Sequence, residues 1–311
     1  MTARLLAAAA LALAAAGNAI GQDAQAYRRI ERLEGTLTVA GSSSTANIVR
    51  TWGTAFQRHY PKATVRVVTS SSSAAPRAMV EDAGTIGMMS RTMNEKERQA
   101  VAGARGRPPL ELKVAIDAVA IYVFKNNPLT AISLEEVERV FSAAPRTGGR
   151  AETWGQLGAQ GSWAARPIIA FGFDRGRGVY EVMRELALGN AEYRPTVRTE
   201  PVSTSVVQGV GVEAGGIGYA SAYYRTARTK VLPIRTAGDA VAPTDEAIAT
   251  GKYPLARFLY LYSSPGARSD DVAREFLLFV LSTEGQDMVK ILGAFPIPLS
   301  LASSQRAALG R

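Results

Sequence analysis

The chain has 311 residues, of which 47% are hydrophobic and 20% charged, with a formal net charge of +9. It has no cysteine, which excludes disulfides, thiolate metal ligands and thiol nucleophiles. The single histidine, His59, is expected to face solvent and excludes histidine clusters and serine–histidine triads. The dispersed arginines do not interleave with aromatic residues, so nucleic acid is not an expected partner. At roughly 100–200 residues per domain, we expect two domains.

The first 21 residues form a segment of their own. Arg4 precedes an alanine- and leucine-rich run over 5–16, and small residues follow at Gly17, Ala19 and Gly21. This pattern is typical of a secretory signal peptide, and the run is too short and alanine-rich for a membrane span. A retained anchor is the alternative. We therefore expect a mature protein that is periplasmic or secreted, with a net charge of +8 once Arg4 is removed.

The segment from Leu37 to Asn47 predicts a buried strand, a tight turn and a serine-rich start to a helix over 46–60. Ser44 or Thr45 is the expected N-cap, since a hydroxyl there would accept a hydrogen bond from a free backbone N–H. The remaining N–H groups and hydroxyls lie at the positive end of the helix dipole and are suited to an oxyanion. A capped helix without a ligand is the alternative interpretation.

A second serine-rich loop, 70–77, follows a predicted strand over 65–69 and precedes an amphipathic helix. A flexible serine linker is the alternative, but linkers rarely stand between a strand and such a helix. A third short strand is predicted over 85–91. The loop 70–77 is therefore a second candidate for contact with a ligand.

Two pairs of residues have the spacing of a capping box, in which side chain and backbone of two residues cap a helix start reciprocally. Thr92 pairs with Glu95, and Ser133 pairs with Glu136 ahead of a helix that continues to Phe141. Both pairs predict the first residue of a helix.

Two later helix starts are also polar. A strand over 167–173 is followed by the loop 174–177, which carries two arginines, and by a helix over 179–188. Arginine suits oxyanions because its guanidinium donates two parallel hydrogen bonds. An exposed turn with solvated arginines is the alternative. Val202–Ser205 opens a further helix, ahead of a glycine-marked strand over 215–220.

Two apolar strands, 113–124 and 253–262, are long enough to cross from one domain to another. The chain is expected to end with helices over 270–281 and 283–292 and a proline-rich tail over 295–299. The alternation of strands and helices predicts an α/β protein with helices on both faces of its sheets. Ligands of such sheets bind beyond the carboxyl ends of the strands, where the polar loops could meet.

Several motifs resemble the phosphate-binding proteins of ABC-type phosphate transporters, and the resemblance covers about 37–299. These motifs are Ala40-Gly-Ser-Ser-Ser44, Ile86-Gly-Met-Met-Ser-Arg91, Val114-Ala-Ile-Asp-Ala-Val-Ala120 with Asn127-Pro128, Thr153-Trp-Gly-Gln-Leu-Gly158, Gly215-Gly-Ile-Gly-Tyr219, Tyr253-Pro-Leu-Ala-Arg257 and Phe279-Val-Leu-Ser-Thr-Glu-Gly-Gln286. The resemblance implies the two-lobed type II periplasmic binding-protein fold, with two crossover strands as a hinge. Lobe I would comprise 27–118 plus 252–311, and lobe II would comprise 119–251.

The resemblance also implies ligand residues. Ser43 and Ser44 match the first loop, where the family binds phosphate with a hydroxyl and a backbone N–H, and Ser72 matches the hydroxyl of the second loop. The third position is often an acidic residue that accepts a hydrogen bond from protonated phosphate. Here it is Ser90, which can donate as well as accept.

The fourth loop departs from the family pattern of Ser-Gly-Thr preceded by an arginine. This chain has Asp174, Arg175, Gly176 and Arg177, and Ala170 stands near the place of the arginine. Arg175 or Arg177 would then supply the positive charge. Asp174 would repel a dianion unless it accepts a proton from it or points away.

The sequence therefore predicts an exported, monomeric solute-binding protein that captures an oxyanion, inorganic phosphate, in its cleft and serves an ABC transporter permease. It is not expected to be an enzyme or to need a cofactor or metal. One alternative is a secreted interaction or sensing protein of the same fold, with phosphate binding lost or changed to sulfate or molybdate. Another is a serine hydrolase, for which no general base is evident.

Overall fold

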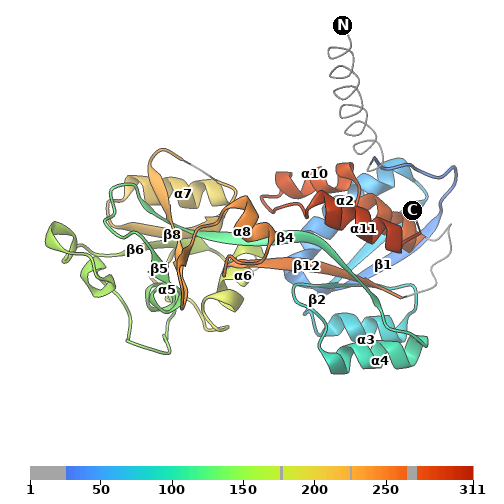
Figure 1. Cartoon of the computed structure of the whole chain (residues 1–311), viewed down its shortest axis with the longest axis horizontal. Coiled ribbons are helices and arrows are strands. Elements are labelled where there is room, and N and C mark those ends of the chain that lie inside the picture. Colours follow the sequence, from blue (N-terminus) through green and yellow to red (C-terminus); the bar gives the residue numbers. More distant parts are fainter. Residues whose placement is uncertain (1–25, 176–177, 225, 265–271, 311) are drawn as a thin grey trace, which may run out of the picture.

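The computed structural model describes residues 26–175, 178–224, 226–264 and 272–310. The predicted signal peptide, 1–21, lies outside the described residues, as do Gly176 and Arg177. The protein is a mixed α/β structure in which helices cover both faces of the strands (Figure 1).

The predicted strands and helices lie close to their expected positions, and several short strands and the helices at 245–249 and 299–308 were not predicted. The strands are β1 (Gly35–Ser42), β2 (Ala63–Ser70), β3 (Ile86–Met89), β4 (Leu110–Phe124), β5 (Ile132–Ser133), β6 (Ile169–Phe173), β7 (Arg198–Glu200), β8 (Gly216–Ser221), β9 (Thr229–Leu232), β10 (Ile234–Arg235), β11 (Ala240–Val241) and β12 (Ala256–Ser263). The helices are α2 (Ser43–His59), α3 (Ala74–Glu81), α4 (Glu95–Arg105), α5 (Leu134–Phe141), α6 (Gly178–Leu186), α7 (Ser203–Val212), α8 (Asp245–Ala249), α9 (Val272–Val280), α10 (Thr283–Ile291) and α11 (Leu299–Ala308). Two short 3₁₀ turns span Trp154–Leu157 and Gly161–Trp163.

Among the described residues, nine strands form one sheet in the order β2-β1-β3-β12-β4-β8-β6-β7, with β9 paired to β4. Strands β1, β2 and β3 are parallel to one another, and β6 is parallel to both β7 and β8. The carboxyl ends of β1 and β6 both lead directly into helix starts, at Ser43 and Gly178. The sheet therefore brings polar loops from distant parts of the sequence to the same region.

Strands β4 and β12 run through both halves of the molecule (Figure 1). The first part of β4, up to Ala118, pairs with β12, and the part from Val119 onward pairs with β8 and β9. The pairing of β4 agrees with the expectation that a long strand crosses between the halves, whereas β12 pairs, among the described residues, only with β3 and the first part of β4. Residues 116–118 therefore lie where the chain passes from one half to the other.

The helix starts show which capping predictions succeed. Ser133 and Glu136 form the predicted capping box of α5. The box predicted at Thr92 is wrong: α4 begins at Glu95, and Asn94 and Glu97 cap it reciprocally. Asn94 is as good a cap as threonine, so spacing alone could not choose between the two registers.

Two further features differ from expectation, helix α11 and the half-buried His59. Helix α11, Leu299–Ala308, follows the proline-rich segment that was expected to be the tail. His59, expected to face solvent, bonds through Nε2 to Glu284 Oε1 at 3.0 Å and packs against Tyr27 and Phe279. The apolar face of α2 is buried as predicted, with the Trp52 indole N–H donating to the Gly285 carbonyl at 2.7 Å.

Candidate functional site

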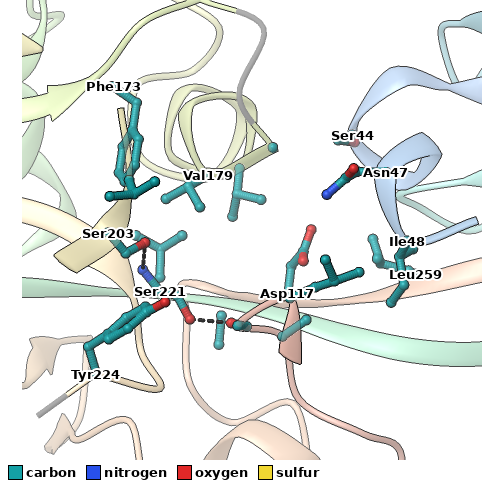
Figure 2. Close-up of a pocket in the computed structure, with 18 of the residues that line it drawn as sticks. Ser44, Asn47, Ile48, Asp117, Phe173, Val179, Ser203, Ser221, Tyr224 and Leu259 are labelled. Atoms are coloured by element: carbon teal, nitrogen blue, oxygen red, sulfur yellow. Dashed lines mark hydrogen bonds between the residues drawn. The ribbon is translucent and has the colours of Figure 1, made fainter. Parts of the chain in front are cut away.

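A cavity of about 450 Å³ opens between the two halves of the molecule. The first residues of three helices line it, namely Ser43 and Ser44 of α2, Gly178 of α6 and Ser203 of α7. Asp117 of the crossover strand β4 lies between them (Figure 2). Each helix start presents backbone N–H groups without intrahelical partners and a partial positive charge, so the cavity is suited to a small anion.

The start of α2 is held by its serines in an unexpected way. The helix begins at Ser43, so its N-cap is Ser42 rather than Ser44 or Thr45, and the Ser42 side chain does not cap the helix. Its hydroxyl instead bonds to the Ser44 hydroxyl at 2.8 Å and donates to the Ser90 hydroxyl at 3.4 Å. The backbone N–H groups of the first turn of α2 therefore do not donate a hydrogen bond to the Ser42 side chain.

The second and third predicted loops join this arrangement. The hydroxyls of Ser72 and Ser90 are 3.2 Å apart, and the Ser90 backbone N–H donates to the Ser72 hydroxyl at 3.1 Å. Ser44, Ser42, Ser90 and Ser72 thus form one chain of hydrogen-bonded hydroxyls, called here the serine chain. Ser43 and Ser44 line the cavity, whereas Ser72 and Ser90 do not and are connected to Ser44 through the serine chain.

The loop after β6 also lies at the cavity, next to the start of α2. A Cβ added to Gly178, the first residue of α6, would lie 3.6 Å from the Ser44 carbonyl oxygen. The starts of α2 and α6 therefore lie next to each other at the cavity. Strands β1 and β6 run in opposite directions within the sheet, each ending at the cavity, and so bring this loop and the first serine loop together.

The charged residues of that loop point elsewhere. Asp174 and Arg175 are exposed, and neither lines the cavity. Arg175 forms an ion pair with Glu192, and its side chain is 71% exposed. Gly176 and Arg177 lie outside the described residues. In the described part of the loop, no guanidinium reaches the cavity.

The sequence interpretation missed several residues that line the cavity. Asn47 and Arg50 lie four and seven positions after Ser43, hence on the same face of α2. Arg50 is the one lysine or arginine among the described residues around the cavity. Helical spacing from Ser43 could have identified both. Ser203 belongs to a helix start that the sequence marked as polar without assigning it a role.

Asp117 is the acidic residue of the cavity wall. It lies directly opposite Arg257 of β12, and its Oδ2 is 3.9 Å from the Arg257 Nε. Arg257 in turn bonds through Nη1 to Glu185 of α6. Burial raises the pKa of Asp117 above its usual range, and Glu185 adds to this effect while Arg257 opposes it.

The described part of the chain contains neither a metal-binding cluster nor a membrane-spanning helix. No group of three or more His, Asp or Glu side chains there is arranged to hold a metal ion. None of the helices in the described ranges combines the length and apolar character needed to cross a bilayer.

The α/β fold with two crossover strands and an anion-suited cavity at the strand ends defines a class of protein. The PBP superfamily domain matches residues 19–284, and the chain belongs to this superfamily. It is 36% identical over 316 residues to the phosphate-binding protein PstS of Pseudomonas aeruginosa, covering 100% of this chain and 98% of that protein. The resemblance noted from the sequence motifs is therefore confirmed.

Solved structures show the same fold. A possible phosphate-binding protein from Planctomyces limnophilus has a TM-score of 0.79 at 24% identity, covering 89% of this chain and 98% of that one. An ABC-type phosphate transport receptor from Vibrio cholerae has a TM-score of 0.63 at 20% identity, covering 84% of this chain and 100% of that one. These likenesses confirm the predicted type II periplasmic binding-protein fold.

Proposed function

We propose that this protein is an exported solute-binding protein that captures inorganic phosphate in the cavity between its two halves. The observation that carries this proposal is the convergence of three helix starts, those of α2, α6 and α7, on one cavity. Helix starts bind oxyanions because unpaired N–H groups and the helix dipole both favour negative charge. The 36% identity to PstS, over nearly the full length of both chains, supports phosphate as the anion.

The ligand residues follow from this placement. Ser43 and Ser44 would bind the anion with hydroxyl and backbone N–H groups, and Ser203 would add a hydroxyl from the opposite side. Ser72 and Ser90 would act through the serine chain, or directly in a closed form. Of the loop after β6, we assign the N–H groups at the start of α6 to the ligand and leave Asp174 and Arg175 in solvent.

The two halves would close over the ligand as lobes. We propose 27–118 plus 252–311 as lobe I and 119–251 as lobe II, with β4 and β12 as the hinge. Such closure around a bound solute is a hinge motion. Export would follow from the signal peptide over 1–21, and a monomer would deliver phosphate to an ABC transporter permease without catalysing a reaction.

Isothermal titration calorimetry of the mature chain with phosphate and sulfate tests the proposal. We expect binding of phosphate, preference over sulfate, and a loss of about 2- to 10-fold in affinity for Ser203→Ala, since one neutral hydrogen bond contributes about 0.5–1.5 kcal/mol. Ser205→Ala is the matched control, because Ser205 lies on the same helix, does not line the cavity and bonds to the Val202 carbonyl. Absence of binding to phosphate would refute the proposal.

A further inference from the structure

Arg257, the second residue of β12, is a buried arginine with an incomplete set of partners. Its side chain is 8% exposed, and its Nε and Nη2 have no hydrogen-bond partner among the described residues. Its Nη1 donates to the Glu185 carboxylate of α6. Because a buried charge is costly unless an opposite charge pairs with it, Arg257 depends on Glu185.

Asp117 does not replace Glu185 as the partner of Arg257. Asp117 and Arg257 lie opposite each other on β4 and β12, but the Asp117 Oδ2 is 3.9 Å from the Arg257 Nε, which is too long for a hydrogen bond. Removal of the Glu185 carboxylate would therefore leave the guanidinium buried without a hydrogen-bonded anion. The Arg257–Glu185 pair is expected to contribute more to the structure than the exposed ion pairs do.

The Arg257–Glu185 pair joins the two proposed lobes. Arg257 belongs to lobe I, and Glu185 lies in the last turn of α6 in lobe II, 72 residues away in sequence. Of the ion pairs between described residues, it is the one that crosses from one lobe to the other. The hydroxyl of Ser221 also donates across the halves, to the Gly293 carbonyl. A charge-assisted hydrogen bond is stronger than a neutral one, so the ion pair is expected to be the stronger of these two links.

Helix α6 connects the Arg257–Glu185 pair to the cavity. The helix begins at Gly178, which lines the cavity beside Ser44, and it ends at Leu186, directly after Glu185. The distance from Gly178 to Glu185 is about 10 Å along the helix axis, since an α-helix rises about 1.5 Å per residue. Because a helix moves as a rigid element, anchoring Glu185 also fixes the backbone N–H groups that α6 presents to an anion.

We propose that Arg257 and Glu185 are positioning residues that hold the two lobes together around the bound anion. The lobes must separate for the anion to leave, and their separation moves α6 away from β12. A hydrogen bond does not survive such a displacement, so opening breaks the Arg257–Glu185 pair. The pair thus slows release of the anion and raises affinity without contacting the anion. This inference rests on the proposed function and its two lobes.

Calorimetry gives the dissociation constant for phosphate, and a chase of bound radioactive phosphate with unlabelled phosphate gives the release rate. The association rate follows from the two. Arg257→Gln and Glu185→Gln should each raise the release rate and the dissociation constant about 10-fold, as expected for a charge-assisted hydrogen bond that solvent partly screens, and should leave the association rate within about 2-fold. Because both substitutions remove the same contact, the double variant should also lose only about 10-fold.

Glu181→Gln is the matched control. Glu181 lies on α6 one turn before Glu185, carries the same charge and pairs with Arg184 of the same helix. Its substitution changes the net charge of α6 as Glu185→Gln does, but it breaks no ion pair between the lobes. The release rate should therefore stay within about 2-fold of the wild-type value. Circular dichroism confirms that each variant is folded.

The outcomes separate this inference from the proposed function. If the wild-type protein does not bind phosphate, the proposed function fails. If it binds phosphate and the folded single variants keep the wild-type release rate, only the role of the Arg257–Glu185 pair fails. Losses that multiply to about 100-fold in the double variant would mean that the two residues act separately, which also contradicts the proposal. Should Arg257→Gln not fold, Glu185→Gln decides alone, since the Glu185 side chain is 35% exposed and tolerates substitution better.

Discussion

The two sides of the cavity satisfy their polar groups in opposite ways. On the α2 side, serines from three separate loops bond to one another and Arg50 lines the cavity. On the α6 side, Arg175 turns away to pair with Glu192. The α2 side therefore offers a preorganised set of donors, whereas the described part of the α6 side offers helix-end N–H groups and no cation. The comparison shows that arginines next to a ligand loop in sequence need not face the ligand.

The largest expected effect comes from placing a negative charge on the α2 side. Ser44→Asp should abolish phosphate binding, because two unit charges about 4 Å apart in a partly solvated site repel by about 4 kcal/mol, roughly 1000-fold in affinity. Calorimetry measures the loss. Ser304→Asp, on the exposed face of α11, is the control and should bind as wild type does. Retained binding by Ser44→Asp would place the ligand away from α2.

A smaller effect is expected for the cation of the α2 side. Arg50→Gln should lower phosphate affinity by up to about 10-fold and reduce its salt dependence, since it removes an exposed positive charge at the cavity. Affinity measured at low and high salt checks both parts. Arg58→Gln is the matched control, because Arg58 lies on the same helix and outside the cavity. Equal losses for the two variants would mean that only the net charge matters.

The smallest effect is expected on the α6 side. Arg175→Ala should change phosphate affinity by less than about 2-fold, because an exposed pair such as Arg175–Glu192 contributes little and does not touch the cavity. The same titration measures it. A 10-fold loss would instead show that Arg175 leaves Glu192 and contacts the anion in the closed form, and the contrast between the two sides would no longer hold.

The sequence predicts the fold more fully than the site. Alternating strands and helices, two long strands and the serine-rich loops were sufficient to expect an α/β protein with polar loops at the strand ends. The start of α11 was missed because a proline-rich segment precedes it, although proline is well tolerated at a helix start. Ser133 with Glu136 gave the start of α5 because no competing cap stands next to it.

The site residues from the interior of elements were harder to predict. Asp117 stands in an apolar run that shows only a long strand, and the strand must be placed between two halves before its carboxylate is seen to face a cavity. Arg175 shows the opposite problem. Its position after β6 suggested a ligand contact. Its long side chain instead pairs with Glu192, which is 17 residues away in sequence. Such choices depend on tertiary structure.

The serine chain has a direction, because each hydroxyl carries one proton. Ser42 donates to Ser90, so its bond with Ser44 requires the Ser44 proton to point away from the cavity. For Ser44 to donate to an anion, Ser42 must turn its own proton towards Ser44 and release the longer bond, 3.4 Å, to Ser90. Rotation of hydroxyl protons is sufficient for this reversal. Binding of an anion at α2 would thus change the donor and acceptor roles of the hydroxyls as far as the loop that precedes α3. No heavy atom would need to move.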